Sequence, residues 1–234
     1  MRPVKVPEPQ ERPPMTRATD QPAPERPTAD LGPTVADLFP DVTSDAARRL
    51  IISAVASFAE RGYHATTTRH ISEGAGLSSA AMYVHFPTKE QVLFEAGKVG
   101  HEGVLAAIRE AVAEHTDPRD RMRELVRAFT LWHARHHTMC RVAQYELAAL
   151  SPEHHAIIAE IRRQTEHFVR EEIRRGVDSG AFVVPDVTTA ALAVLSMGID
   201  VARWYLPGRS VDAEQLADRY AELAASMLRT RPRS

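Results

Sequence analysis

The stretch from Thr66 to Gln91 constrains the fold more than any other part of the chain. Its pattern predicts two short helices separated by a glycine turn. Thr67 is a good N-cap for the first helix, and Gly76 supplies the left-handed residue that ends it. Ser78 is then placed to cap a second helix over residues 79–85. Helix, glycine turn and helix at this spacing are typical of a helix-turn-helix that reads DNA.

Helical periodicity continues on both sides of this stretch. Upstream, apolar residues recur at helical spacing: Ala47, Ile51, Ala54, Val55 and Phe58. Downstream, caps and apolar stripes predict six more helices, over about 88–114, 117–136, 142–150, 151–179, 185–205 and 212–230. In the last helix, we expect Leu216, Tyr220, Leu223 and Met227 to lie inward. No strand pattern of useful length appears, so the sequence predicts an all-α fold of nine helices.

Composition narrows the class of protein. Of the 234 residues, 44% are hydrophobic, which is enough for a sizeable core, and the single cysteine excludes an internal disulfide. The N-terminus has no apolar signal segment, and the longest weakly polar run, 187–199, is shorter than the ~20 residues of a membrane span. We therefore expect a cytoplasmic protein without a membrane partner. The net charge of −2 means that any DNA contact depends on local charge.

Residues 1–43 differ from the rest of the chain. They hold ten of the sixteen prolines and show no helical period. The composition predicts a disordered, proline-rich N-terminal arm. An alternative is a short docking motif around Leu38 and Phe39, the only large apolar pair of the arm.

The motif strings identify a family resemblance. The strings TTRxI, AGLS, MYxHF and KE occur in this order, within a match that is continuous from Ala46 to Leu93. This pattern resembles the DNA-binding domain of TetR-family transcriptional regulators. His70 departs from it, because the family often has an acidic residue or alanine there, and we therefore expect no reciprocal capping box with Thr67. The resemblance implies a helix-turn-helix domain over residues 44–91, followed by a helical ligand-binding and dimerisation domain over 92–230.

Candidate DNA contacts follow from helix geometry and from the resemblance. The N-terminal residues of a recognition helix meet base edges, which here are Ser78, Ser79 and Ala80. The start of the first motif helix offers hydroxyls, amides and a cation to phosphates, at Thr67, Thr68 and Arg69. The resemblance adds phosphate contacts at Tyr83, His85 and Lys89. Alternatives are a buried core role for Tyr83 and a plain solvated charge for Lys89.

A ligand pocket is predicted where aromatic and polar residues gather on the later helices. The candidates are Phe129, Trp132, His133, His136, Tyr145, Arg203 and Trp204. Ordinary core packing of Phe129 and Trp132 is the alternative. Histidines three or four apart can bind zinc, but that helix offers no third ligand, so we expect no metal and no cofactor.

The pocket region carries a second resemblance. The string RWYLPG, residues 203–208, is similar to one in actinobacterial TetR-type regulators of lipid and sterol breakdown, several of which respond to acyl-coenzyme A thioesters. Leu195 and Ile199 are apolar where sterol-responsive relatives differ, which counts against a sterol-derived ligand and leaves a plain acyl chain.

These observations predict a ligand-responsive repressor. It would bind an inverted-repeat operator in double-stranded DNA as a homodimer formed through the last two helices, whose small residues allow close approach. Those small residues could instead bury both helices within one subunit. A small hydrophobic effector, for example a fatty acyl-CoA, would release the DNA. Alternative functions are a response to a non-lipid compound such as an antibiotic, an interaction protein without an effector, and an enzyme, for which no catalytic motif is present.

Overall fold

A computed structural model describes residues 44–208 and 211–228, and within these ranges the protein is helical and has no strand. The predicted all-α, nine-helix architecture is confirmed for this part of the chain. The expected disordered arm, residues 1–43, lies outside the described residues. The elements in order are α2 Asp45–Arg61, α3 Thr68–Gly74, α4 Ser79–His85, α5 Lys89–Ala113, α6 Pro118–Arg135, α7 His137–Tyr145, the 3-10 helix η1 Leu147–Ala149, α8 Pro152–Asp178, α9 Val187–Trp204 and α10 Ala213–Met227.

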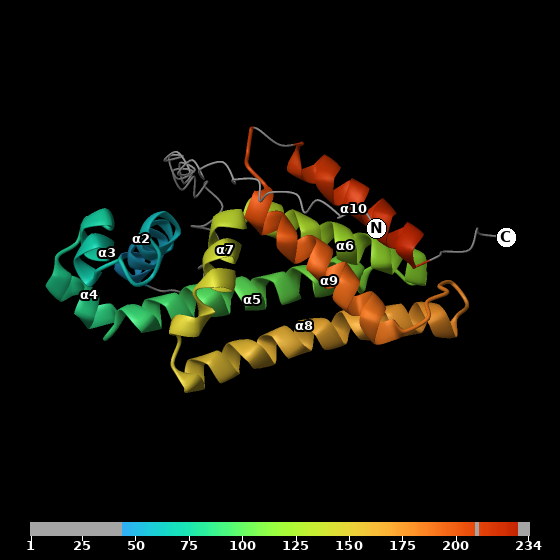
Figure 1. The fold of residues 1–234 in the computed structure, drawn as a ribbon, viewed down its shortest axis with the longest axis horizontal. Coiled ribbons are helices and arrows are strands. Elements are labelled where there is room, and N and C mark those ends of the chain that lie inside the picture. Colours follow the sequence, from blue (N-terminus) through green and yellow to red (C-terminus); the bar gives the residue numbers. More distant parts are fainter. Residues whose placement is uncertain (1–43, 209–210, 229–234) are drawn as a thin grey trace, which may run out of the picture.

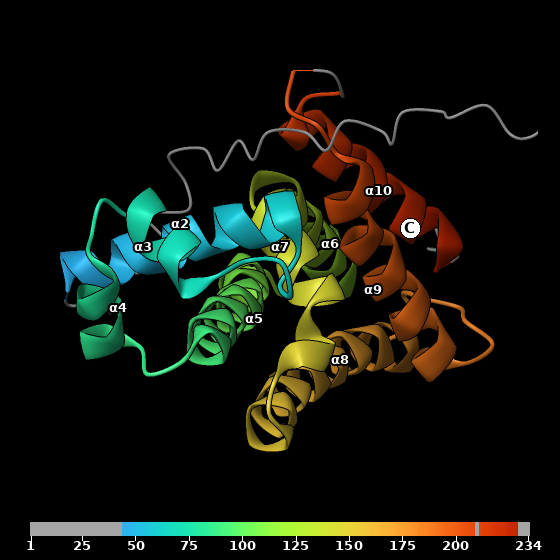
Figure 2. The ribbon, with the colours of Figure 1, turned by 60° about the vertical axis from the view of Figure 1, so that its left-hand side comes forward.

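The helices form two parts of different size, and the larger part, α5 to α10, is here called the body. Helices α2, α3 and α4, here called the reader, lie at one end of an elongated molecule (Figure 1). Helix α5 leaves the reader and runs along the body beside α6 and α8, while α9 crosses them and α10 packs on α6 at the outer edge (Figures 1 and 2). Helix α7 contacts both α2 and α5, so it joins the reader to the body.

Two hydrophobic cores meet at this joint. The reader's core includes Leu50, Phe58 and Ile71, and it extends into α5 and α7 through residues such as Leu93 and Met139. The body's core is built mainly from α5, α6, α8 and α9. Trp132 of α6 packs against both cores. Because protein cores are close-packed, a displacement of this side chain is transmitted to both sides.

Side-chain caps begin most of the helices, including the predicted caps Thr67 and Ser78. Side chains of the residue before the first turn accept a backbone N–H at Ser44, Thr67, Ser78, Thr88, Asp117, Ser151, Asp186 and Asp212. Each of these contacts satisfies a donor that a helix leaves free at its N-terminus.

One predicted helix, over residues 142–150, is wrong. Helix α7 begins at His137 and ends at Tyr145, and a separate 3-10 turn follows at Leu147–Ala149. The backbone of His136 bends (φ −108°, ψ 29°), so α6 ends and α7 begins without a connecting loop. The bend contains neither glycine nor proline, which left the sequence without a signal for it.

The last two helices expose apolar surface in the single chain. Leu216 of α10 is buried as expected, but Leu223 is 56% exposed and Met227 is also exposed, so the inward prediction is wrong for both. Among the described helices, α9 alone is long and apolar enough to cross a membrane by length and composition, a test that core helices of soluble proteins also pass. In this fold α9 packs against α6 and α8.

Candidate functional site

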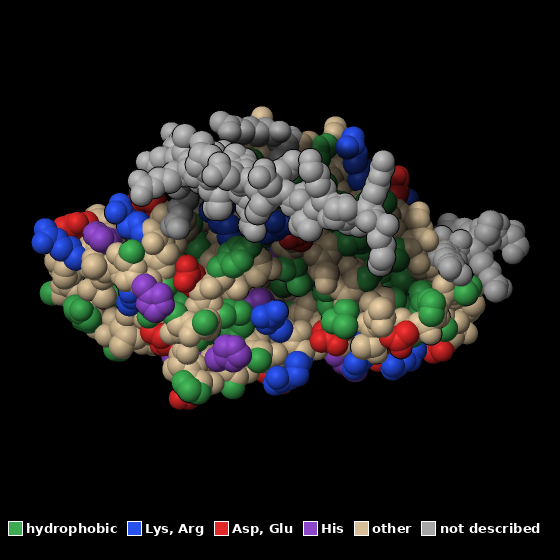
Figure 3. All heavy atoms as spheres, in the orientation of Figure 1, with side chains coloured by type: hydrophobic (Ala, Val, Ile, Leu, Met, Phe, Trp, Pro, Cys, Tyr) green, Lys and Arg blue, Asp and Glu red, His purple; other side chains and the backbone are tan. Residues whose placement is uncertain are grey.

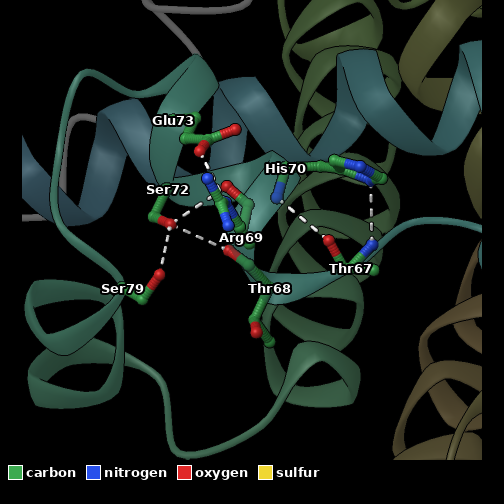
Figure 4. A network of polar contacts seen from close by, with 7 residues as sticks. All are labelled: Thr67, Thr68, Arg69, His70, Ser72, Glu73 and Ser79. Carbon is green, nitrogen blue, oxygen red and sulfur yellow. Dashed lines mark hydrogen bonds and ion pairs between the residues drawn. The ribbon is translucent and has the colours of Figure 1, made fainter.

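The N-terminus of α3 is held by a reciprocal capping box. Thr67 Oγ1 accepts the N–H of His70 (3.1 Å), and His70 Nδ1 accepts the N–H of Thr67 at 3.2 Å (Figure 4). The expectation that His70 could not complete the box is therefore wrong, because an imidazole nitrogen serves as the acceptor in place of a carboxylate. Arg69 points outward and pairs with Glu73 at 2.7 Å.

Helix α4 presents its N-terminus to solvent beside α3. Ser78 accepts the N–H of Ala81 as the cap, and Ser79 and Ala80 are exposed. Tyr83 is 54% exposed, so the buried alternative for it is wrong, and its hydroxyl lies 3.3 Å from Thr68 Oγ1. The predicted contacts from α3 and α4 therefore lie side by side, and His85 is half-buried at the end of α4.

Side chains of α2 hold α3 and the turn after it in place beside α4. Ser53 of α2 donates to the carbonyl of Ile71 at 2.8 Å, and Arg49 donates to the carbonyl of Ala75. Gly76 adopts φ 66° in the turn, as the sequence predicts. A residue that the sequence analysis missed is Val84, which is 79% exposed on α4 and could meet a thymine methyl group.

Lys89 is engaged with the protein itself. Its Nζ donates to the carbonyls of Tyr63 (2.7 Å) and Thr66 (2.6 Å) and lies 4.1 Å from the Tyr63 ring centroid. Burial lowers the pKa of Lys89 below its usual value, and the charge of Glu146 acts in the opposite direction. The solvated-charge alternative is therefore wrong for this residue in the free protein.

A cavity of about 420 Å³ is bounded by α5, α6, α7, α8 and α9, and it opens to solvent where lining residues such as Leu192 and Arg162 are exposed. Of the predicted pocket residues, Phe129, Trp132 and His133 line it. His136 is buried beside it, with its ring centroid 4.5 Å from that of Trp132.

The other predicted pocket residues lie elsewhere. Tyr145 is 57% exposed and lines a depression between α2 and α7. Arg203 pairs with Asp200 at 2.7 Å, and Trp204 is exposed at the end of α9. Arg203 and Trp204 are therefore not part of the cavity wall. The side chains of α9 that reach the cavity belong to earlier turns of the helix, for example Leu195 and Ile199.

Comparison with known proteins agrees with this geometry. Residues 50–96 match the family described as "Bacterial regulatory proteins, tetR family", and residues 115–228 match "Tetracyclin repressor-like, C-terminal domain". A solved structure of a tetR-family bacterial regulatory protein from Rhodococcus RHA1 is 43% identical, with a TM-score of 0.77, and the match covers 81% of this chain and 100% of that one. The chain belongs to the TetR family of transcriptional regulators.

Two further relatives have informative descriptions. The ketosteroid transcriptional regulator KstR2 of Mycobacterium tuberculosis is 28% identical with a TM-score of 0.74, over 82% of this regulator and 97% of that chain. AibR, solved in complex with isovaleryl coenzyme A and operator DNA, is 23% identical with a TM-score of 0.71, over 80% and 100% of the two chains. At that identity the likeness to AibR shows the fold alone.

Burial keeps two histidines neutral near pH 7, His133 in the lining of the regulator's cavity and His136 beside it. The pKa of His133 is lowered to about 4 by burial, and its Nδ1–H donates to the carbonyl of Phe129 at 2.8 Å. The pKa of His136 is likewise lowered to about 4, first by burial and then by the charge of Arg135. Burial also raises the pKa of the Cys140 thiol to about 12. Among the described residues, no group of three or more His, Cys, Asp or Glu side chains is placed to hold a metal.

The cavity residues on α5 and α8 were missed in the sequence. They include Gly100, His101, His155 and Arg162. A signal was present, because glycines inside a helix are costly and indicate close packing. A Cβ at Gly103 would lie 2.2 Å from Trp132, and one at Gly100 would lie 3.1 Å from Met139, so these two glycines of α5 mark the approach of cavity-lining side chains.

Proposed function

We propose that the regulator is a repressor that binds an inverted-repeat operator as a homodimer and is released by a small hydrophobic effector held in the body's cavity. The observation that carries this proposal is the position of Trp132, which lines the cavity and packs against the cores of both body and reader. An effector that displaces this side chain acts on the element that positions the reader. The proposal assigns the protein no catalytic step, and its place of action is the cytoplasm.

The reader supplies the operator contacts. Ser78, Ser79 and Ala80 are exposed at the start of α4, where a recognition helix meets base edges. Thr67, Thr68 and Arg69 at the start of α3 would hold phosphates, together with Tyr83, His85 and Lys89. Phosphate contacts position the reader and carry no sequence information directly.

Two readers are needed, because a single module buries too little surface to be selective among genomic sites. The exposed apolar residues of α10, namely Leu223 and Met227, give this helix an apolar face in the single chain. Burying this face against a second copy would place two readers on one DNA duplex with two-fold symmetry.

The apolar lining of the cavity and the descriptions of two similar regulators support a lipid effector. Phe129, Leu195 and Ile199 give the cavity apolar walls. KstR2 is described as a ketosteroid regulator, and AibR, which has the same fold, was solved with an acyl-coenzyme A. We therefore propose an acyl-coenzyme A thioester or the corresponding free acid. A tenfold loss of operator affinity needs ~1.4 kcal/mol of coupling, and each buried methylene contributes ~0.8 kcal/mol.

The test compares operator binding and effector response in the same protein. Fragments of the source genome retained by the protein give the operator, and dodecanoyl-coenzyme A should then release it while quenching tryptophan fluorescence over one concentration range. Trp132→Ala should weaken this response more than it weakens operator binding. The matched control is Trp204→Ala, because Trp204 is exposed outside the cavity. Operator binding that no acyl ligand alters would refute the lipid effector and leave DNA binding intact.

A further inference from the structure

One corner of the cavity is polar and basic. Its walls on α5 and α8 carry His101, His155, Arg162 and Arg163, against a single lining carboxylate, Glu166. Figure 3 shows Lys or Arg and His side chains gathered over the N-terminal part of α8 on this face of the molecule. A purely hydrophobic ligand would gain nothing from such a wall, because charged groups stay hydrated unless a partner replaces the water.

One ring nitrogen of His101, in this corner of the cavity, lacks a hydrogen-bond partner. Its Nε2 is buried and, within the part of the chain that the structure describes, has no hydrogen-bond partner. The same holds for Nε1 of Trp132, which can only donate. Buried polar atoms in folded proteins are nearly always paired, so two unpaired atoms in one cavity lining indicate a partner that is not part of the protein. The indole N–H can only donate, so whatever meets it carries an acceptor, as water or the carbonyl or carboxylate oxygen of a ligand does.

Arg162 supplies the charge. Neighbouring Arg163 is held by Glu160 at 2.6 Å, whereas Arg162, which lines the cavity but is also exposed to solvent, has no ion-pair partner among the described residues. Its charge reaches His101, whose pKa is lowered to about 4 by burial first, by Arg162 second and by His133 third. His101 and Arg162 therefore face the same space from two helices, where a negatively charged oxygen could accept a hydrogen bond from the imidazole and pair with the guanidinium.

We propose that His101 and Arg162 bind the anionic, oxygen-bearing head of an amphipathic effector, while its apolar tail lies against Phe129, Leu195 and Ile199. This inference rests on the proposed effector cavity and adds the class and direction of the ligand. The shared chemistry is an acceptor oxygen and a negative charge at one end of an acyl chain. The source is either the carboxylate of a free fatty acid or the thioester oxygen and phosphates of an acyl-coenzyme A.

The experiment titrates the full-length protein with dodecanoate, dodecanoyl-coenzyme A and dodecanol, following tryptophan fluorescence and operator release. The three probes share one tail, so differences report the head. Dodecanol should bind at least about tenfold more weakly than the better anion, which corresponds to one charge-assisted hydrogen bond. Arg162→Gln should weaken the bound anion by about the same factor and leave dodecanol unchanged. Arg174→Gln is the matched control on α8, because Arg174 pairs with Glu171 and does not line the cavity.

The outcomes separate this inference from the proposed function. Equal binding of both anions would identify the carboxyl oxygen as sufficient, and preference for the thioester would identify the phosphates; both support an anionic head. Dodecanol binding as tightly as the anions, with no effect of Arg162→Gln, would overturn the head-group assignment while the hydrophobic effector stands. Failure of all three probes to bind, with operator binding retained, would overturn the acyl effector itself and this inference with it.

Discussion

At the scale of single residues, Lys89 joins the reader to α5. It is the first residue of α5, and its ammonium group bonds two carbonyls of the loop that precedes α3. The carbonyl of Thr66 belongs to a buried residue, so water cannot easily replace this donor. The side chain therefore ties the first turn of α5 to the loop that precedes α3.

We expect Lys89→Met to lower the free energy of unfolding by about 2 kcal/mol, since it leaves these carbonyls without a charged donor. Lys98→Met is the control on the same helix, because Lys98 only approaches Glu102 at 4.0 Å. Urea denaturation of the two variants makes the comparison, and equal stabilities would contradict the positioning role. If Lys89 also bonds a phosphate, the Lys89→Met protein should show a smaller slope of log operator affinity against log salt concentration, by about one unit per subunit.

Cys140 gives a second prediction at this scale. Its pKa of about 12 is three units above the ordinary 9.0, so at pH 8 the reactive thiolate is roughly a thousandfold scarcer than in the unfolded chain. Iodoacetamide should therefore label the native protein about that much more slowly than the urea-unfolded protein. Mass spectrometry of quenched samples measures the two rates, and fast labelling of native protein would show that the thiol is not in this environment.

At the scale of elements, α5 is the helix on which the reader and the cavity both depend. Its first turn is fixed to α8, because Glu90 accepts from the N–H of Ser151 (2.8 Å) and from His154 Nδ1 at 2.8 Å. His154 also stacks on Phe94 with ring centroids 3.8 Å apart. A shift of α8 on effector binding would thus reach the start of α5, one residue from Lys89. Its middle turns carry the glycines against which cavity side chains pack.

Two of these glycines predict opposite effects in one helix. Gly103→Ala should destabilise by about 1–3 kcal/mol and shift the tryptophan emission, because the added Cβ would lie 2.2 Å from Trp132. Gly97→Ala should stabilise by up to ~1 kcal/mol, because its Cβ would meet only Ile158, at an ordinary 3.8 Å, and alanine favours the helix. Thermal unfolding and emission spectra of both variants test this contrast. A stabilising Gly103→Ala would show that Trp132 is free to move away.

At the scale of the whole molecule, α10 leaves apolar side chains exposed on the outside of the single chain. Ion pairs hold α10 on α6, at Arg127 with Asp218 (2.8 Å) and at Arg135 with Glu214. With one face of α10 occupied in this way, its opposite side is left with Leu223 exposed. An apolar face of this kind is characteristic of an interface rather than of a solvated helix.

If the proposed dimer forms through α10, Leu223→Glu should convert it to a monomer, because the substitution places a charge in an apolar interface. Sedimentation at micromolar concentration should show the change in mass, and operator affinity should fall toward that of a half-site. Ile157→Glu is the control, since Ile157 is an exposed apolar residue on α8. A Leu223→Glu protein that stays dimeric would place the interface elsewhere.

The sequence by itself determined the reader and the helical class. Cap residues, glycine turns and 3.6-residue periodicity act within one or two helical turns, so Thr67, Gly76 and Ser78 reveal α3 and α4 without any knowledge of the partner helices. These local rules failed at two places. At His70 an unusual residue completes the capping box, and at the His136 bend between α6 and α7 no glycine or proline marks the break.

Only the tertiary structure decided the cavity. Its lining comes from five α-helices separated by up to a hundred residues, and aromatic residues close in sequence divide between cavity, core and surface. Trp132 and Trp204 looked equivalent in the sequence, yet one lies between two cores and the other faces solvent. The reason is physical: periodicity tells which face of a helix is apolar, whereas the packing angles of the helices decide whether that face meets a core, a cavity or another chain.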